Sequence, residues 1–141
     1  MTENARAPLE DYRLPVKIKL ALMWTALMFL YIYNDYFSLY LPGTIADMTA
    51  GRMGPLGPAT PQILIGVSIM LATPSLMIVL SAVLPPVISR WLNVLLGGVY
   101  TAIQAMTFPG SPPFYQIVVA LEVALTVAVI WTALRWPRTP N

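Results

Sequence analysis

Two carboxylates lie inside otherwise apolar stretches of this chain, and they are the residues best suited to chemistry. Asp35 stands near the far end of the first apolar stretch, and Glu122 stands within the last one. Gln104 is the most polar residue of the stretch before it. Ionisable residues at membrane depth are costly to bury and usually functional. These side chains are therefore the first candidates for a proton-titratable or cation-binding site.

The composition indicates a membrane protein. Hydrophobic residues make up 57% of the 141 residues and charged residues only 10%, whereas a soluble domain carries about 25% charged residues. The charges gather in the tails and connections and leave long apolar runs between them. The length fits a single domain, so we expect residues 1–141 to form one membrane domain in contact with the lipid bilayer.

Several classes of function are excluded by residue type. The chain has no Cys and no His, which excludes disulfides, zinc sites with Cys or His ligands, haem ligation and His-based catalysis. We expect no cofactor, no metal site and no nucleic-acid partner. An enzyme acting on lipid or quinone, with Asp35 as base, is the least favoured hypothesis, because two acids alone are weak evidence for catalysis.

Proline and glycine divide the chain into four apolar segments that are each long enough to cross a bilayer. The predicted fold is an all-α, four-helix membrane bundle with a tail at 1–16 and spans at about 17–41, 62–84, 87–108 and 114–135. The first apolar run could instead be a cleaved signal peptide, but it is longer than the usual hydrophobic region of one. A retained signal-anchor helix is the better interpretation.

The segment 42–60 and Pro74 each predict a local departure from regular helix. The Gly- and Pro-rich segment 42–60 predicts an ordered, irregular loop, in which Thr44 caps a short interfacial helix that runs through Met48. Pro74 lies within the second span and predicts a kink, since it removes the helical donor to the Met70 carbonyl. We expect the neighbouring hydroxyls of Thr73 and Ser75 to satisfy part of the freed backbone.

The basic residues predict the orientation. With four spans, every Lys and Arg except Arg52 lies on the side that carries both termini. Cytoplasmic segments of membrane proteins are enriched in these residues. Both termini are therefore expected in the cytoplasm, and the loop at 42–60 on the outer side.

Depth and helical face bring the polar residues together. At about 1.5 Å per residue, Asp35, Gln104 and Glu122 lie roughly 20–24 Å from the cytoplasmic edge. Three stripes are predicted to face the bundle interior: Trp24, Met28, Tyr31, Asp35 and Ser38 in the first span, Asn93, Gly97, Tyr100 and Gln104 in the third, and Tyr115, Glu122, Thr126 and Val129 in the fourth. The predicted ligand-binding residues are Asp35, Glu122, Gln104, Tyr31 and Tyr100.

No basic residue shares this layer, so burial is expected to favour the neutral acid at Glu122, hydrogen-bonded to Gln104 or a tyrosine hydroxyl. Asp35 lies nearer the surface and stays ionised if loop amides or Arg52 reach it. The polar layer is either a site that opens outward or a hydrogen-bonded plug that fixes helix register.

Small residues recur at the spacing of helix contacts in membranes. The rows are Gly97-Thr101-Ala105 and Gly98-Ala102 in the third span and Ala120-Ala124-Ala128 in the fourth. They either pack these two spans together or join two copies of the chain or a membrane partner. Packing within the bundle is favoured, because neighbouring antiparallel helices must meet.

Several short motifs are distinctive, above all Asp35-Tyr36-Phe37 followed by Tyr40-Leu41-Pro42-Gly43, and further Gly51-Arg52-Met53-Gly54-Pro55, Pro74-Ser75-Leu76-Met77 and Arg90-Trp91-Leu92-Asn93. In these motifs the sequence resembles a family of small four-span bacterial membrane proteins of unknown function. The resemblance implies a location in the bacterial cytoplasmic membrane and implies no activity. The residues favour a small transporter or channel-like protein that binds a proton, cation or cationic solute. The alternative is a non-catalytic module or accessory subunit that binds a partner through its small-residue faces.

Overall fold

The computed structural model describes residues 11–138, and within them the chain is helical without a strand. The elements are α1 (Val16–Ser38), α2 (Thr44–Thr49), the 3-10 helix η1 (Gly54–Leu56), α3 (Pro61–Val83), α4 (Pro86–Thr107) and α5 (Pro113–Leu134). The four long helices lie within a few residues of the predicted spans. The short helix α2 is present, but its N-cap is Gly43 and not the predicted Thr44. Most of the predicted tail, residues 1–10, lies outside the described residues.

Three of the long helices, α1, α3 and α5, are long and apolar enough to cross a membrane. The chain is therefore a membrane protein, as its composition predicts. The remaining long helix, α4, has a similar length but a polar face that is turned inward. Its buried residues are Ser89, Asn93, Gly97, Tyr100 and Gln104, whereas its exposed face carries Val87, Ile88, Trp91, Leu95 and Val99.

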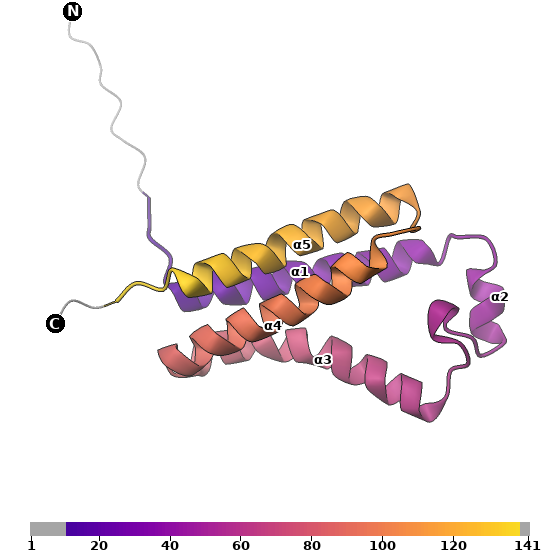
Figure 1. Cartoon of the computed structure of the whole chain (residues 1–141), viewed down its shortest axis with the longest axis horizontal. Coiled ribbons are helices and arrows are strands. Elements are labelled where there is room, and N and C mark those ends of the chain that lie inside the picture. The colour runs from indigo at the N-terminus through magenta and orange to yellow at the C-terminus, as the bar shows by residue number, and fades with distance from the viewer. Residues whose placement is uncertain (1–10, 139–141) are drawn as a thin grey trace, which may run out of the picture.

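The long helices run alternately up and down, so that α1 lies against α3 and α5, and α4 packs on α5 and α3 (Figure 1). We call the end that carries both described chain ends and the α3–α4 turn the termini end. The opposite end, which carries α2 and η1, is the loop end. Figure 1 shows the four helices close together at the termini end, whereas α3 diverges from the others toward the loop end.

A buried hydrogen-bond network joins three helices in the tightly packed half of the bundle. The indole Nε1 of Trp24 in α1 donates to Oδ1 of Asn93 in α4 at 2.7 Å, and the Ser81 hydroxyl of α3 donates to the same oxygen at 3.2 Å. The amide of Asn93 in turn donates to the Ser89 carbonyl at 2.8 Å. All four residues are fully or almost fully buried. Each polar group that we name here has a partner, so the network fixes the register of α1, α3 and α4.

The small-residue rows divide between two roles. Gly97 packs within the bundle, since a Cβ at this position would lie 2.8 Å from Cγ1 of Ile130 in α5. Gly98 has open space around it, and it points away because successive helical residues differ by about 100° in direction. The interpretation that all rows pack spans three and four together is wrong for the exposed members, which are Gly98, Ala102, Ala105, Ala120 and Ala124.

Helix α3 continues through Pro74, and the carbonyl that this proline leaves free is satisfied from another helix. The hydroxyl of Tyr100 in α4 donates to the Met70 carbonyl. The hydroxyls of Thr73 and Ser75 donate instead to the carbonyls of Ile69 and Leu71. These two residues satisfy backbone near the proline but not the Met70 carbonyl itself, because a hydroxyl in a helix reaches the carbonyl four residues before it.

Candidate functional site

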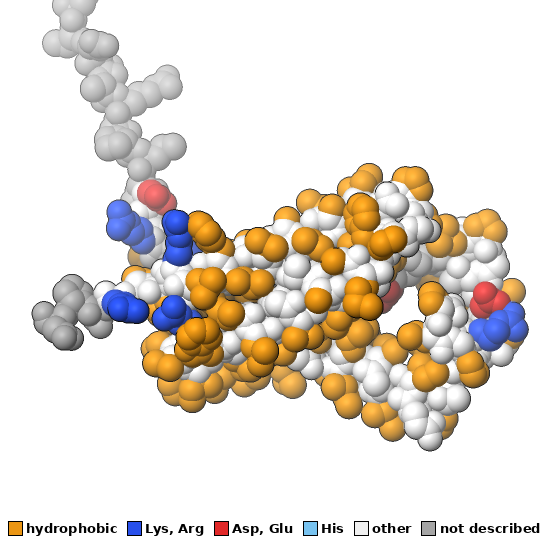
Figure 2. All heavy atoms as spheres, viewed as in Figure 1, with side chains coloured by type: hydrophobic (Ala, Val, Ile, Leu, Met, Phe, Trp, Pro, Cys, Tyr) orange, Lys and Arg blue, Asp and Glu red, His pale blue; other side chains and the backbone are white. Residues whose placement is uncertain are grey.

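A cavity of about 620 Å³ opens at the loop end, where α3 diverges from the other helices. Its wall is formed by α1, α3, α4 and α5, and residues of α2 and η1 contribute from the loop. Figure 2 shows a hollow in this region, with an acidic side chain visible inside it. The divergence of α3 therefore creates a lined space rather than a closed helix contact.

All five predicted site residues line this cavity: Tyr31, Asp35, Tyr100, Gln104 and Glu122. They come from three helices, α1, α4 and α5. Gln104 and Glu122 are each 3% exposed and Tyr100 is 5% exposed, whereas Tyr31 is half-buried.

Asp35 departs from the predicted inward stripe. Its side chain is exposed at the cavity, and the buried residue of this turn is the preceding Asn34, which is 4% exposed. The buried residues of α1 are Leu20, Trp24, Leu27 and Asn34. Trp24 is buried as predicted, whereas Leu27 and Asn34 are buried in place of Met28 and Asp35. The predicted stripe did not include Asn34, which also lines the cavity.

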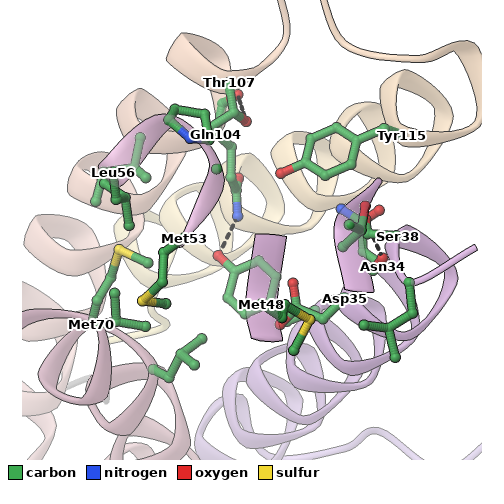
Figure 3. A pocket seen from close by; sticks show the side chains of 18 of the residues that line it. Asn34, Asp35, Ser38, Met48, Met53, Leu56, Met70, Gln104, Thr107 and Tyr115 are labelled. Carbon is green, nitrogen blue, oxygen red and sulfur yellow. Dashed lines mark hydrogen bonds between the residues drawn. The ribbon is translucent and has the colours of Figure 1, made fainter. Parts of the chain in front are cut away.

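A chain of hydrogen bonds joins α1, α4 and α5 beside the cavity. The amide Nε2 of Gln104 donates to the Tyr31 hydroxyl at 2.6 Å (Figure 3). The Thr126 hydroxyl lies 3.3 Å from Oε1 of Gln104 and 3.1 Å from the Glu122 backbone carbonyl. The hydroxyl of Thr101 lies 2.7 Å from that of Thr126. Gln104 is thus held between α1 and α5.

The Glu122 carboxyl has no such partner. Within residues 11–138, no donor reaches its Oε1, although the side chain is almost completely buried. The expected hydrogen bond from Gln104 or a tyrosine hydroxyl is not found among the described residues, where the Gln104 amide nitrogen donates to the Tyr31 hydroxyl instead. Asn34 is in the same situation, since its Oδ1 is buried and no donor among the described residues reaches it. Two acceptors without donors therefore belong to residues in the wall of one cavity.

The charge balance of the cavity is acidic. Three acids, Asp35, Asp47 and Glu122, line it together with a single basic residue, Arg52. Arg52 is paired with Asp47 in the loop, where its Nη2 lies 2.5 Å from Oδ1 and its Nε lies 3.1 Å from the same atom. The expected approach of Arg52 to Asp35 is not found among the described residues, since Arg52 is paired with Asp47 of α2 instead.

The remaining wall is apolar and rich in methionine. Met48 and Met53 come from the loop, Leu56 from η1, and Met70 and Leu71 from α3. Figure 3 shows Met53, Met70 and Leu56 on one side of the cavity and Tyr115, Asn34 and Ser38 on the other. Sequence reasoning missed these apolar residues, because nothing in their spacing shows that the loop lies beside the cavity.

The loop reaches this position through its glycines. Gly43, Gly54 and Gly57 have positive φ angles of 88°, 49° and 80°, a backbone conformation that side chains with a Cβ rarely adopt. An isolated bridge between Arg52 and Pro58 closes the loop on itself. The Gly-Pro pairs therefore were a usable signal for an ordered loop, as predicted, but not for what the loop covers.

A family model described as "Family of unknown function (DUF6326)" matches residues 11–140, and the chain belongs to this family. The match covers nearly the whole sequence and agrees with the resemblance to a family of unknown function. The comparison with curated proteins found no match, and the comparison with solved structures found none either. The site is therefore argued from its own geometry.

Proposed function

We propose that this member of the family is a small transporter or channel-like protein of the bacterial cytoplasmic membrane. In this proposal the cavity at the loop end opens to the outer side and binds a proton, a cation or a cationic solute. Asp35, Glu122, Gln104, Tyr31 and Tyr100 form the binding site, and Asn34 joins them.

The proposal includes α4 as a fourth span. This helix is less apolar on average than the others because its polar residues lie on one face. That face is buried against the other helices and the apolar face is exposed, which is the arrangement expected of a helix surrounded by lipid. Its length of 22 residues is also sufficient to cross the hydrocarbon core.

The orientation is supported by the distribution of charge. The described basic residues other than Arg52 gather at the termini end (Figure 2). The guanidinium of Arg135 stacks on Trp131, with its central carbon 3.9 Å from the ring centroid. Basic and aromatic side chains of this kind anchor helices at the cytoplasmic interface. The termini end is therefore assigned to the cytoplasm.

The observation that carries the proposal is the buried carboxyl of Glu122, whose Oε1 has no hydrogen-bond donor among the described residues. A buried acid without a donor costs free energy, and a ligand that supplies a proton or a positive charge removes that cost. A plug that merely fixes register would be expected to satisfy its own polar groups, as the network around Asn93 does.

The test is flux into proteoliposomes of protons, potassium and an organic cation, each followed with a trapped dye or a label specific for it. We expect the wild-type chain to dissipate an imposed gradient of at least one of the three faster than empty liposomes, and we expect Glu122→Gln to abolish the difference. Asp11→Asn is the matched control, because it also replaces an acid by its amide, at the termini end. Unchanged flux in Glu122→Gln would refute the site, and wild-type flux equal to that of empty liposomes for all three would refute the transport proposal.

A second function, an accessory module that binds a membrane partner, is favoured by the exposed small residues. Gly98, Ala102, Ala120 and Ala124 lie on the surface of α4 and α5, where close approach of another helix is possible. In this case Gly98→Leu or Ala124→Leu should disrupt a complex that co-purifies from the native membrane, and Glu122→Gln should leave it intact. Isolation of the wild-type chain as a monomer without a partner would contradict this alternative.

A further inference from the structure

We propose that the ligand of the cavity at the loop end is an amphipathic organic ammonium ion, with its N–H groups on Glu122 and Asn34 and its apolar body on the methionine wall. This inference rests on the proposed function, because it assigns the ligand class of the same site. It narrows the three ligands allowed above, a proton, a cation or a cationic solute, to one.

The size of the cavity favours an organic ligand. A volume of about 620 Å³ falls in the range of roughly 300–1,000 Å³ that is typical of sites for small organic molecules. A bare metal ion is held instead by several oxygen ligands at short distances. Within residues 11–138, no three acidic side chains gather closely enough to form such a cage.

The hydrogen-bonding groups favour a donor. Oε1 of Glu122 and Oδ1 of Asn34 are buried acceptors without donors in the described chain, and an ammonium group offers up to three N–H donors and no acceptor. An anion is disfavoured by charge, since the lining holds three acids, Asp35, Asp47 and Glu122, and its one basic residue, Arg52, is paired with Asp47. Polar complementarity therefore selects a cation with N–H groups.

The apolar wall favours a ligand whose apolar part can vary in shape. Met48, Met53 and Met70 supply flexible, polarisable side chains that adapt to different ligand outlines. Such a wall gains affinity from apolar area without demanding one shape. Affinity should therefore rise with the length of an alkyl chain, by up to about fourfold for each methylene that is buried.

The experiment measures binding to the full chain in lipid nanodiscs by calorimetry, with the heats of empty nanodiscs subtracted. The probes are hexylammonium, methylammonium, rubidium and hexanol. We expect hexylammonium to bind at least tenfold more tightly than methylammonium and rubidium, and hexanol to bind no better than to empty nanodiscs. Glu122→Gln should weaken hexylammonium binding at least tenfold, and Asp11→Asn should leave it unchanged.

A second variant tests the apolar wall separately from the charge. Met53→Ser, which changes a loop residue outside the long helices, should weaken hexylammonium binding several-fold and leave methylammonium binding unchanged. Equal hexylammonium binding in wild type and Glu122→Gln would overturn the inference, since the cavity would then be a plain apolar pocket.

The probes also separate this inference from the function on which it rests. If rubidium or a proton binds in a manner that depends on Glu122 while hexylammonium does not, the proposed function stands and the organic ligand is wrong. If none of the probes and no proton flux depends on Glu122, both are wrong. Tight hexylammonium binding that requires Glu122 and Met53 supports both.

Discussion

The two ends of the bundle treat buried amide and carboxyl oxygens in opposite ways. In the termini half, Asn93 is surrounded by Trp24, Ser81 and Ser89, and its oxygen and nitrogen both have partners. In the loop half, Asn34 and Glu122 are buried to a similar extent, and each keeps an oxygen without a donor among the described residues. The contrast concerns these oxygens, since the Nε of Arg90 at the termini end also has no hydrogen-bond partner within residues 11–138. The oxygen is satisfied where α3 lies close to the other helices, and the oxygens without donors lie where α3 diverges.

The largest expected effect comes from removing the centre of the satisfied network. Asn93→Ala should lower the free energy of unfolding by about 3 kcal/mol, because the Trp24 indole and the Ser81 hydroxyl would stay buried without their acceptor. Asn34→Ala is the matched control and should cost clearly less, since its Oδ1 receives no hydrogen bond from the described chain. Reversible unfolding in mixed micelles measures both. Equal losses would erase the contrast between the two halves.

An intermediate effect is expected at the boundary of the two halves. Tyr100→Phe should cost about 1–2 kcal/mol, since the Met70 carbonyl then lacks a donor. In a Pro74→Ala background the same substitution should cost much less, because residue 74 would regain the N–H that a helix normally donates to Met70. A double-mutant cycle on unfolding free energy checks this. Additive effects would show that the tyrosine acts in another way.

A smaller effect on stability is expected in the open half. Glu122→Gln should change the free energy of unfolding by less than about 1 kcal/mol, because the carboxyl gives up no hydrogen bond to the described chain. Its effect on ligand binding should be large, as described above. If unfolding measurements show instead a loss as large as that of Asn93→Ala, Glu122 belongs to a structural plug and the two halves are alike.

The smallest effect is expected in the loop. Arg52→Gln removes an ion pair whose side chains are 58% and 48% exposed, and exposed pairs of this kind contribute up to about 1 kcal/mol. We expect a shift in stability of about 0.5 kcal/mol or less, measured by the same unfolding assay and reduced further at high salt. A larger loss would mean that the loop closes the cavity and stabilises the whole loop end.

Much of the fold could be predicted because proline marks the helix limits. Pro61, Pro86 and Pro113 each begin a long helix, at the position where a missing N–H costs nothing. The inward face of α4 was predictable for a related reason, since its polar residues repeat at helical spacing and alternate with an apolar face. Local chemistry decided these features.

The rest depended on contacts between distant residues. The choice between Asn34 and Asp35 turns on a small rotation of α1, which is set by how Trp24 and Leu27 pack and not by the local pattern. The donor for the Met70 carbonyl lies 30 residues away in Tyr100. The residues of the candidate site were predictable as a set because depth and face agree for three helices. The unpaired acceptor oxygens of Asn34 and Glu122 could not be predicted, because they depend on which side chains of distant residues donate to which oxygens.

The inverted amphipathicity of α4 has a consequence for biogenesis. The side chains of Asn93 and Tyr100 have hydrogen-bonding partners on α1 and α3, which are synthesised before α4. Gln104 has one partner on α1 and one on α5. Gly97 and Thr101, in contrast, contact α5, which is synthesised after it. If α4 is a fourth span, as proposed, a nascent α4 on its own would carry a row of polar groups against lipid tails, at considerable cost. Its stable integration would then require that α1 and α3 are already present to receive it, and the order of the helices along the chain would supply that sequence of events.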